Sequence, residues 1–266
     1  MQIFSRRLAQ TTILIFVTIA LALSAQATTY SKASLNGSYS FLTNLWTADA
    51  STNQIAMVGV LTFNGAGKVN GSYTLVSLQV SHAGTLVGTY TVSSNGTGKI
   101  TFTSGSTAKF AIALNNPTSA GVAQGVQLLQ TNDSNNEIVS GIAVLQSTTA
   151  QTYTAASIKG NFSFQWNIWT ANASGYEGSI IGTCNFDGNG KFKSSGTQVL
   201  GGVAKAATET GTYTVNPDGS GTISFSGSEV AFVLNSVASG QARGAQFIQN
   251  LDESGNYVIT GTALQQ

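Results

Sequence analysis

A segment of seventeen residues occurs twice in the chain, and this repetition constrains the fold more than any other feature. The copies begin at Leu35 and Ile158, and both read Gly-x-aromatic-Ser-Phe-x-x-Asn-x-Trp-Thr-Ala-x-Ala-Ser from their third residue on. An offset of 123 positions relates Gly37 to Gly160, and it falls to 120 toward the end of each copy. Because this period is far longer than the roughly 20–50 residues of solenoid and propeller repeats, each copy is predicted to fold as a domain.

The first 27 residues have the pattern of an export signal. Arg6 and Arg7 precede an apolar run, and Ala25-Gln-Ala27 forms a small-residue cleavage site. We therefore expect cleavage near Ala27 and secretion to the extracellular space, the periplasm or the cell surface. After Ala27 the sequence has no apolar run long enough to cross a bilayer as a helix, so no transmembrane helix is expected.

The remaining sequence divides into two copies and a connector. The first copy is predicted to be one domain at 33–146, and the second copy is predicted to be another at 156–266. The connector at 147–155 contains neither charge nor proline, and it is too short to hold the domains far apart. We therefore expect the two domains to lie in contact.

Charge is scarce in this chain. Charged residues make up 8% of the sequence, whereas about 25% is usual in soluble domains. The formal net charge is +1, so no long-range attraction to nucleic acid or to anionic lipid is expected.

Cys184 is the only cysteine, which excludes an internal disulfide and leaves packing to stabilise the fold. It occupies the position of Leu61 in the first copy, within an apolar segment. We therefore interpret it as a small buried apolar side chain rather than a reactive thiol.

Each copy predicts eight short strands. Most of the segments are rich in Val, Ile, Thr, Tyr and Phe, several alternate apolar with polar residues, and Asn-Gly or Asp-Gly pairs between them are typical of hairpins. In the first copy the strands are expected at 37–46, 54–63, 68–80, 85–93, 98–103, 108–114, 121–130 and 137–146. In the second copy they are expected at 160–169, 178–186, 191–199, 209–215, 221–226, 229–234, 240–249 and 257–264.

Eight sequential strands leave two unpaired edges, and closing the sheet removes both. The fold class is therefore predicted to be all-β, with two tandem antiparallel eight-stranded up-and-down barrels. A barrel of this size is filled by side chains or holds one small ligand. Two β-sandwiches are the alternative.

The first strand of each copy opens with Gly37-Ser-Tyr39 or Gly160-Asn-Phe162. These residues resemble the Gly-x-Trp motif of the lipocalin and avidin-type, calycin-like barrels, with another aromatic in place of Trp. The resemblance implies that Tyr39 and Phe162 close one end of each barrel. The wider repeat also resembles that of uncharacterised secreted tandem-repeat proteins of soil bacteria, which implies export and β architecture but no activity.

The sequence offers no catalytic motif, and no catalytic residue, metal or cofactor is assigned. His82 is the only histidine, and Lys205 occupies its position in the second copy, so a solvated loop residue is favoured over a base or metal ligand. The segment 185–190 resembles the start of an EF-hand loop, but Gly196 stands where the bidentate acid belongs. A hairpin turn is therefore favoured over a calcium site.

The candidate ligand-binding residues share one face of the first strand of each copy. Side chains alternate between the two faces of a strand, so Asn44 and Trp46 lie together, as do Gln165, Asn167 and Trp169. If this face points into the lumen, the Asn and Trp side chains can bind a sugar ring or a small aromatic molecule. If it points outward, the Trp side chains cover a barrel rim or the contact between domains.

Three classes of function follow from these observations. The favoured class is a secreted binding or carrier module for a small apolar or sugar-like ligand, and the alternative is a structural or surface-adhesion protein with filled barrels. A cofactor-free enzyme of the cyclase or isomerase kind is third, because such a barrel needs only cavity shape and a few polar groups. An outer-membrane pore is disfavoured by the polar, charge-poor sequence. The sequence predicts no particular oligomeric state.

Overall fold

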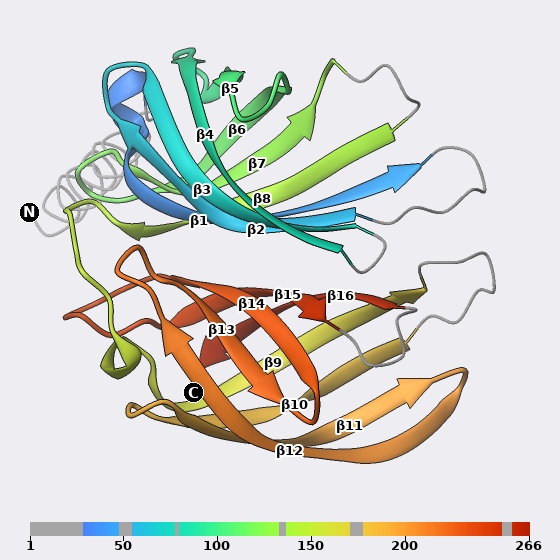
Figure 1. The fold of residues 1–266 in the computed structure, drawn as a ribbon. Helices are drawn as coiled ribbons and strands as arrows, with labels where there is room; N and C mark the ends of the chain where they lie inside the picture. The colour runs from blue at the N-terminus through green and yellow to red at the C-terminus, as the bar shows by residue number, and fades with distance from the viewer. Residues whose placement is uncertain (1–28, 48–54, 78–79, 133–136, 171–177, 252–256) are drawn as a thin grey trace, which may run out of the picture.

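The structure, a computed structural model, describes residues 29–47, 55–77, 80–132, 137–170, 178–251 and 257–266 (Figure 1). The predicted export signal at 1–27 therefore lies outside the described residues. Within the described ranges, no helix has the length and apolar character needed to cross a membrane.

Sixteen strands and two short 3-10 helices make up the described secondary structure. The first half contains η1 (Lys32–Ser34), β1 (Asn36–Thr47), β2 (Ile55–Asn64), β3 (Lys68–Ser77), β4 (Val80–Val92), β5 (Thr97–Ser104), β6 (Lys109–Pro117), β7 (Ala123–Gln130) and β8 (Glu137–Ser147). The second half contains η2 (Ala155–Ser157), β9 (Lys159–Thr170), β10 (Gly178–Asp187), β11 (Lys191–Leu200), β12 (Val203–Val215), β13 (Ser220–Phe225), β14 (Ser228–Asn235), β15 (Gly244–Leu251) and β16 (Tyr257–Gln265).

The strands form two closed antiparallel barrels of eight strands each (Figure 1). Each strand pairs with its neighbour in sequence, and each sheet closes where its first strand pairs with its last, β1 with β8 and β9 with β16. Closure leaves neither sheet with an unpaired edge. The predicted fold class is therefore confirmed, and the sandwich alternative is wrong.

In each barrel the second strand of the third hairpin begins earlier than the sequence predicts. The third strand was expected to continue through Val80, whereas β4 already begins there, and β12 begins at Val203 rather than at position 209. The first residues of β4, Val80 to Ala83, are all exposed, so no alternation of buried apolar and exposed polar residues reveals them. His82 consequently lies exposed in a strand and not in a loop.

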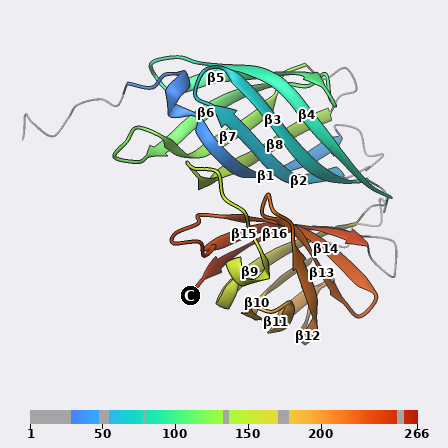
Figure 2. The same cartoon turned by 60° about the vertical axis from the view of Figure 1, so that its left-hand side comes forward.

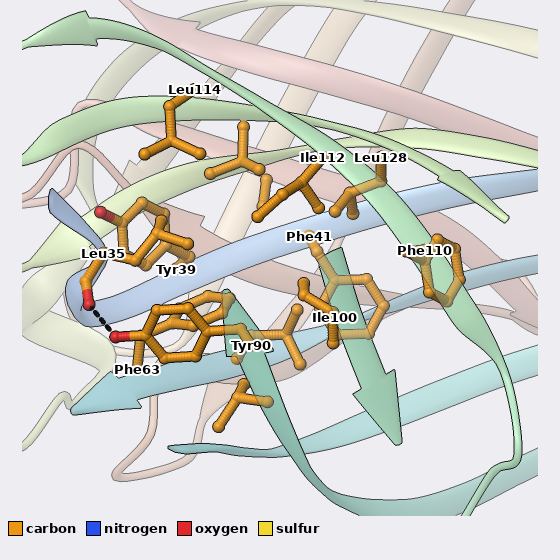
Figure 3. Close-up of a cluster of buried hydrophobic side chains, with 14 of the residues drawn as sticks. Leu35, Tyr39, Phe41, Phe63, Tyr90, Ile100, Phe110, Ile112, Leu114 and Leu128 are labelled. Atoms are coloured by element: carbon orange, nitrogen blue, oxygen red, sulfur yellow. Dashed lines mark hydrogen bonds between the residues drawn. The ribbon is translucent and has the colours of Figure 1, made fainter. Parts of the chain in front are cut away.

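A short 3-10 helix closes one end of each barrel. The hydroxyl of Tyr90 donates to the carbonyl oxygens of Lys32 and Leu35 at 2.9 and 2.8 Å, which ties η1 to the barrel wall (Figure 3). The hydroxyl of Tyr213 holds η2 in the same way, with distances of 3.0 and 3.1 Å. The sequence repeat is thus also a repeat of hydrogen bonds.

Tyr39 and Phe162 are fully buried at these closed ends. Tyr39 packs edge-on against Phe63 with ring centroids 5.4 Å apart (Figure 3). Phe162 packs edge-on against Phe186 in the second barrel, with ring centroids 5.6 Å apart. The Tyr39 hydroxyl also donates to the carbonyl oxygen of Ala123 at 2.7 Å, and burial raises the pKa of this hydroxyl well above its ordinary value. Both aromatic residues occupy the closing position that the calycin-like resemblance implies.

The two barrels lie one beside the other, with β1 and β2 facing β15 and β16 (Figure 2). A third apolar cluster, outside both lumens, joins them. It joins the outer face of β1, β2 and β3 to the outer face of β14, β15 and β16. We call it the inter-barrel cluster, and it consists of Leu42, Ala56, Val58, Val60, Val76, Ala231, Val233, Ile248 and Val258.

Polar contacts reinforce the inter-barrel cluster. The side-chain nitrogen of Gln146 donates to the carbonyl oxygen of Leu234 at 2.7 Å, and the backbone N–H of Ser236 donates to that of Leu145 at 2.9 Å. Ser72 donates to a carboxylate oxygen of Asp218 at 2.9 Å. The barrels are therefore held by packing and by hydrogen bonds as well as by the connector.

Candidate functional site

The lumen of the second barrel is lined by the face of β9 that carries Phe162, Phe164 and Trp166. Gln165 and Asn167 lie on the opposite, outer face and are exposed. The hypothesis that the Asn and Trp of this outer face point into the lumen is therefore wrong, because β9 has the opposite orientation. A role for these residues in binding a ligand from outside the barrel stays a prediction.

The remaining candidates also belong to the outer face. Trp169 is half-buried and pairs with Val258 of the inter-barrel cluster, as expected for a residue that covers the contact between domains. Asn44 is half-buried on the face that carries Leu42. The side chain of Trp46 lies outside the described residues.

A cavity of about 100 Å³ lies inside the second barrel. For comparison, an apolar cavity of about 150 Å³ is large enough to bind benzene. The lining is mostly aromatic, with three polar side chains. It comprises Phe164, Trp166, Ile180, Cys184, Phe186, Phe192, Ser194, Gln198, Ala207, Glu209, Ile223, Phe225 and Phe247.

Trp166 is the centre of this lining. Its ring centroid lies 5.4 Å from that of Phe164, 6.3 Å from that of Phe225 and 6.1 Å from that of Phe247. Gly261 faces it across the sheet, and a Cβ atom there would lie 2.3 Å from the indole Cδ1. The absence of a side chain on Gly261 therefore gives the indole its place in the lumen.

The indole N–H of Trp166 is buried and has no hydrogen-bond acceptor among the residues that the structure describes. Leaving a buried donor unpaired costs about 1–3 kcal/mol. A ligand that brings an acceptor oxygen or nitrogen into the cavity would recover this free energy. The orphaned donor of this lining residue is therefore the candidate partner for a polar atom of a ligand.

Three further polar side chains, all half-buried, lie on the cavity wall: Ser194, Gln198 and Glu209. The hydroxyl of Ser226 donates to a carboxylate oxygen of Glu209 at 2.9 Å, which orients that carboxylate. Sequence reasoning missed this set. Comparing the two copies at inward positions would have revealed it, because the first copy has glycine or leucine at all three of these wall positions.

Cys184 also lines the cavity and is 7% exposed. Burial raises the pKa of its thiol from 9.0 to about 12. The thiol therefore stays protonated at neutral pH and packs as a small apolar group, since the thiolate is the reactive form. This confirms the prediction of a buried apolar role.

The first barrel contains a larger cavity, of about 220 Å³. Thr43 occupies the position of Trp166, and this smaller side chain leaves more open space. The lining is predominantly apolar and comprises Thr43, Leu45, Ile55, Met57, Tyr73, Leu75, Leu86, Phe102, Gly105, Ser106, Ala108, Phe110, Gln130 and Val139. The two lumens thus differ in size, and of the two linings only that of the second contains a carboxylate, Glu209.

The segment that resembles an EF-hand loop forms a hairpin turn. The Asp187 carboxylate accepts backbone N–H groups of Asn189 and Lys191 at 2.7 and 3.0 Å, and these bonds lower its pKa. Asn64 accepts the matching pair in the first barrel, both at 2.9 Å. The hairpin prediction is confirmed. Across the described ranges, no three His, Cys, Asp or Glu side chains are grouped as metal ligands.

Comparisons with known proteins return loose structural similarity. A protein of unknown function from the DUF3598 family of Nostoc punctiforme is 12% identical, with 91% of this chain and 100% of that chain covered and a TM-score of 0.26. Isotype 1 transferrin binding protein B of Neisseria meningitidis is 8% identical, with 86% and 76% covered and a TM-score of 0.27. A third structure, described as an AttH protein from Nitrosomonas europaea, is 9% identical. The match covers 86% of this chain and 91% of that chain, with a TM-score of 0.26.

No protein-family model matches the sequence, and no curated protein matches it significantly. TM-scores this low carry no argument about function, so the strand pairing of the chain itself defines the fold. That pairing describes an all-β protein with two closed antiparallel eight-stranded barrels in tandem.

Proposed function

We propose that the chain is an exported binding or carrier protein whose second barrel holds a small, mainly apolar ligand. The observation that carries this proposal is the buried indole N–H of Trp166, a residue that lines the aromatic cavity; this N–H has no acceptor in the described part of the chain. We also propose that the chain is related to the lipocalin and avidin-type barrels and to secreted tandem-repeat proteins.

The lining and the volume together favour a compact ligand with one acceptor atom. Five Phe side chains line the cavity with Trp166, so an apolar group suits it better than a sugar. The volume of about 100 Å³ is smaller than the roughly 150 Å³ of a cavity that binds benzene, so a substituted benzene is too large. A small ketone such as 2-butanone brings one carbonyl oxygen as an acceptor for the indole N–H of Trp166.

The alternative classes receive less support. A purely structural barrel needs no internal space, whereas these lumens hold cavities of about 100 and 220 Å³. For an enzymatic role, the Cys184 thiol supplies no nucleophile, because burial holds it in its protonated form.

A titration with 2-butanone, monitored by isothermal calorimetry, tests the site. We expect Trp166→Phe to weaken binding about tenfold, because it keeps an aromatic ring and removes one hydrogen bond. Trp169→Phe is the matched control on the outer face, and it should leave the affinity unchanged. Equal affinity in wild type and Trp166→Phe would reject the role of the indole N–H.

Native mass spectrometry of the protein recovered from its host's secretion medium tests the carrier role and export together. We expect an extra mass that leaves on unfolding, and a polypeptide mass corresponding to cleavage near Ala27. A bare chain would count against a carried ligand, and retention of residues 1–27 would count against export.

A further inference from the structure

The contact between the two barrels is heterologous, because each barrel uses a different face. The first barrel contributes the outer face of β1 to β3, including Val58 and Val76, which we call face A. The second barrel contributes the outer face of β14 to β16, including Ile248 and Val258, which we call face B. Since the barrels are repeats of one another, each of them also has the other face.

Both of these second faces are open to solvent, and both are apolar at the same positions. On face A of the second barrel, Ile181 and Val199 replace Val58 and Val76, and they are 59% and 41% exposed. Half of the large apolar side chains that are exposed in the described structure belong to these two faces.

Face B of the first barrel has the matching pair. Leu129 and Ile138 stand where the second barrel buries Ile248 and Val258, and they are 49% and 54% exposed. The register supports this equivalence, because Leu129 pairs with Ala111 as Ile248 pairs with Ala231.

The central strands of the open faces, β7 and β10, lie away from the existing contact, whereas β8, which carries Ile138, borders it through Gln146. In Figure 1, β6 and β7 lie on the upper side of the first barrel, while β10 and β11 lie on the lower side of the second barrel. A heterologous contact that does not close on itself can be repeated from molecule to molecule. The open face A of one chain can therefore receive the open face B of the next.

From this we infer that the chain associates head to tail with a second copy of itself, through face A of its second barrel and face B of its first. The new contact repeats the one that already joins the barrels within the chain. Burial of Ile181, Val199, Leu129 and Ile138 provides its driving force.

The association is weaker than the internal contact. Gln165 and Thr183 replace Leu42 and Val60 on face A, so the open face is more polar than the buried one. Two separate chains also lose translational and rotational freedom on binding, whereas the barrels of one chain are already joined. Association should therefore depend on protein concentration.

Sedimentation velocity of the exported protein, from about 1 µM to about 1 mM, tests the inference in the range of weak association. We expect the weight-average mass to rise with concentration. Ile181→Lys places a charge on the open face A, and Leu129→Lys places one on the open face B. Each variant alone should therefore stay a single chain. Val87→Lys and Val203→Lys alter exposed valines outside both faces, and these controls should associate like wild type.

Mixing the two face variants distinguishes a head-to-tail contact from a symmetric one. Ile181→Lys retains face B and Leu129→Lys retains face A, so an equimolar mixture should form pairs and nothing larger. If circular dichroism shows that one of these variants does not fold, Val199→Lys takes the place of Ile181→Lys, and Ile138→Lys takes the place of Leu129→Lys. A wild type that stays a single chain throughout, face variants that still associate, or a mixture without pairs would each overturn the inference.

Discussion

The thiol of Cys184 makes a specific prediction about alkaline stability. Its pKa is 9.0 in an exposed setting and about 12 in the folded lumen. Below pH 9 both the folded and the unfolded chain keep the proton, so the contribution of the thiol to stability is fully present. Between pH 9 and pH 12 only the unfolded chain releases the proton, and the free energy of unfolding falls as the pH rises.

Three pKa units at about 1.4 kcal/mol per unit amount to a loss of about 4 kcal/mol over that interval, of which about 3 kcal/mol is lost by pH 11. Guanidinium unfolding of wild type and Cys184→Ala at pH 8 and pH 11 measures this loss of stability. The stability of wild type relative to Cys184→Ala should fall by about 3 kcal/mol between these two pH values. The tyrosines titrate in both proteins, so their contribution cancels. A difference that is independent of pH would refute the reasoning.

Four further substitutions have expected effects on the free energy of unfolding. Gly261→Ala places a Cβ atom 2.3 Å from the Trp166 Cδ1, so we expect a loss of about 1–3 kcal/mol and a shift in tryptophan fluorescence. Tyr90→Phe and Tyr213→Phe remove the hydroxyls that hold the 3-10 helices, and each should cost about 1 kcal/mol in chemical denaturation. Gln246→Leu removes a buried amide that has no partner among the described residues and should add about 1 kcal/mol.

Each of these changes has a contradicting outcome. Unchanged fluorescence in Gly261→Ala would mean that the indole does not lie against this glycine. Full stability in both Tyr variants would mean that the helices are held by packing alone. Gln127→Leu is the control for Gln246→Leu, because Gln127 is the exposed counterpart in the first barrel and its replacement should be close to neutral.

Much of the fold follows from the sequence because its signals are local. Two copies in register, eight segments of strand-forming residues in each and Asn-Gly or Asp-Gly turns were enough to predict two eight-stranded barrels. The buried role of Cys184 followed from the apolar residue at its position in the other copy. The start of β4 was missed because its first four residues are all exposed and carry no apolar alternation.

Only the tertiary structure decided which face of the first strand lines the lumen. Alternation defines two faces of a strand but does not say which one is inside, and β9 has a tryptophan on each, Trp166 and Trp169. Gly261, distant in sequence, makes room for Trp166 inside. In the first barrel both faces of β2 are apolar, because its outer face packs against the second barrel. The cavity and the inter-barrel contact both depend on residues that closure of the barrels brings together, and no local pattern records such contacts.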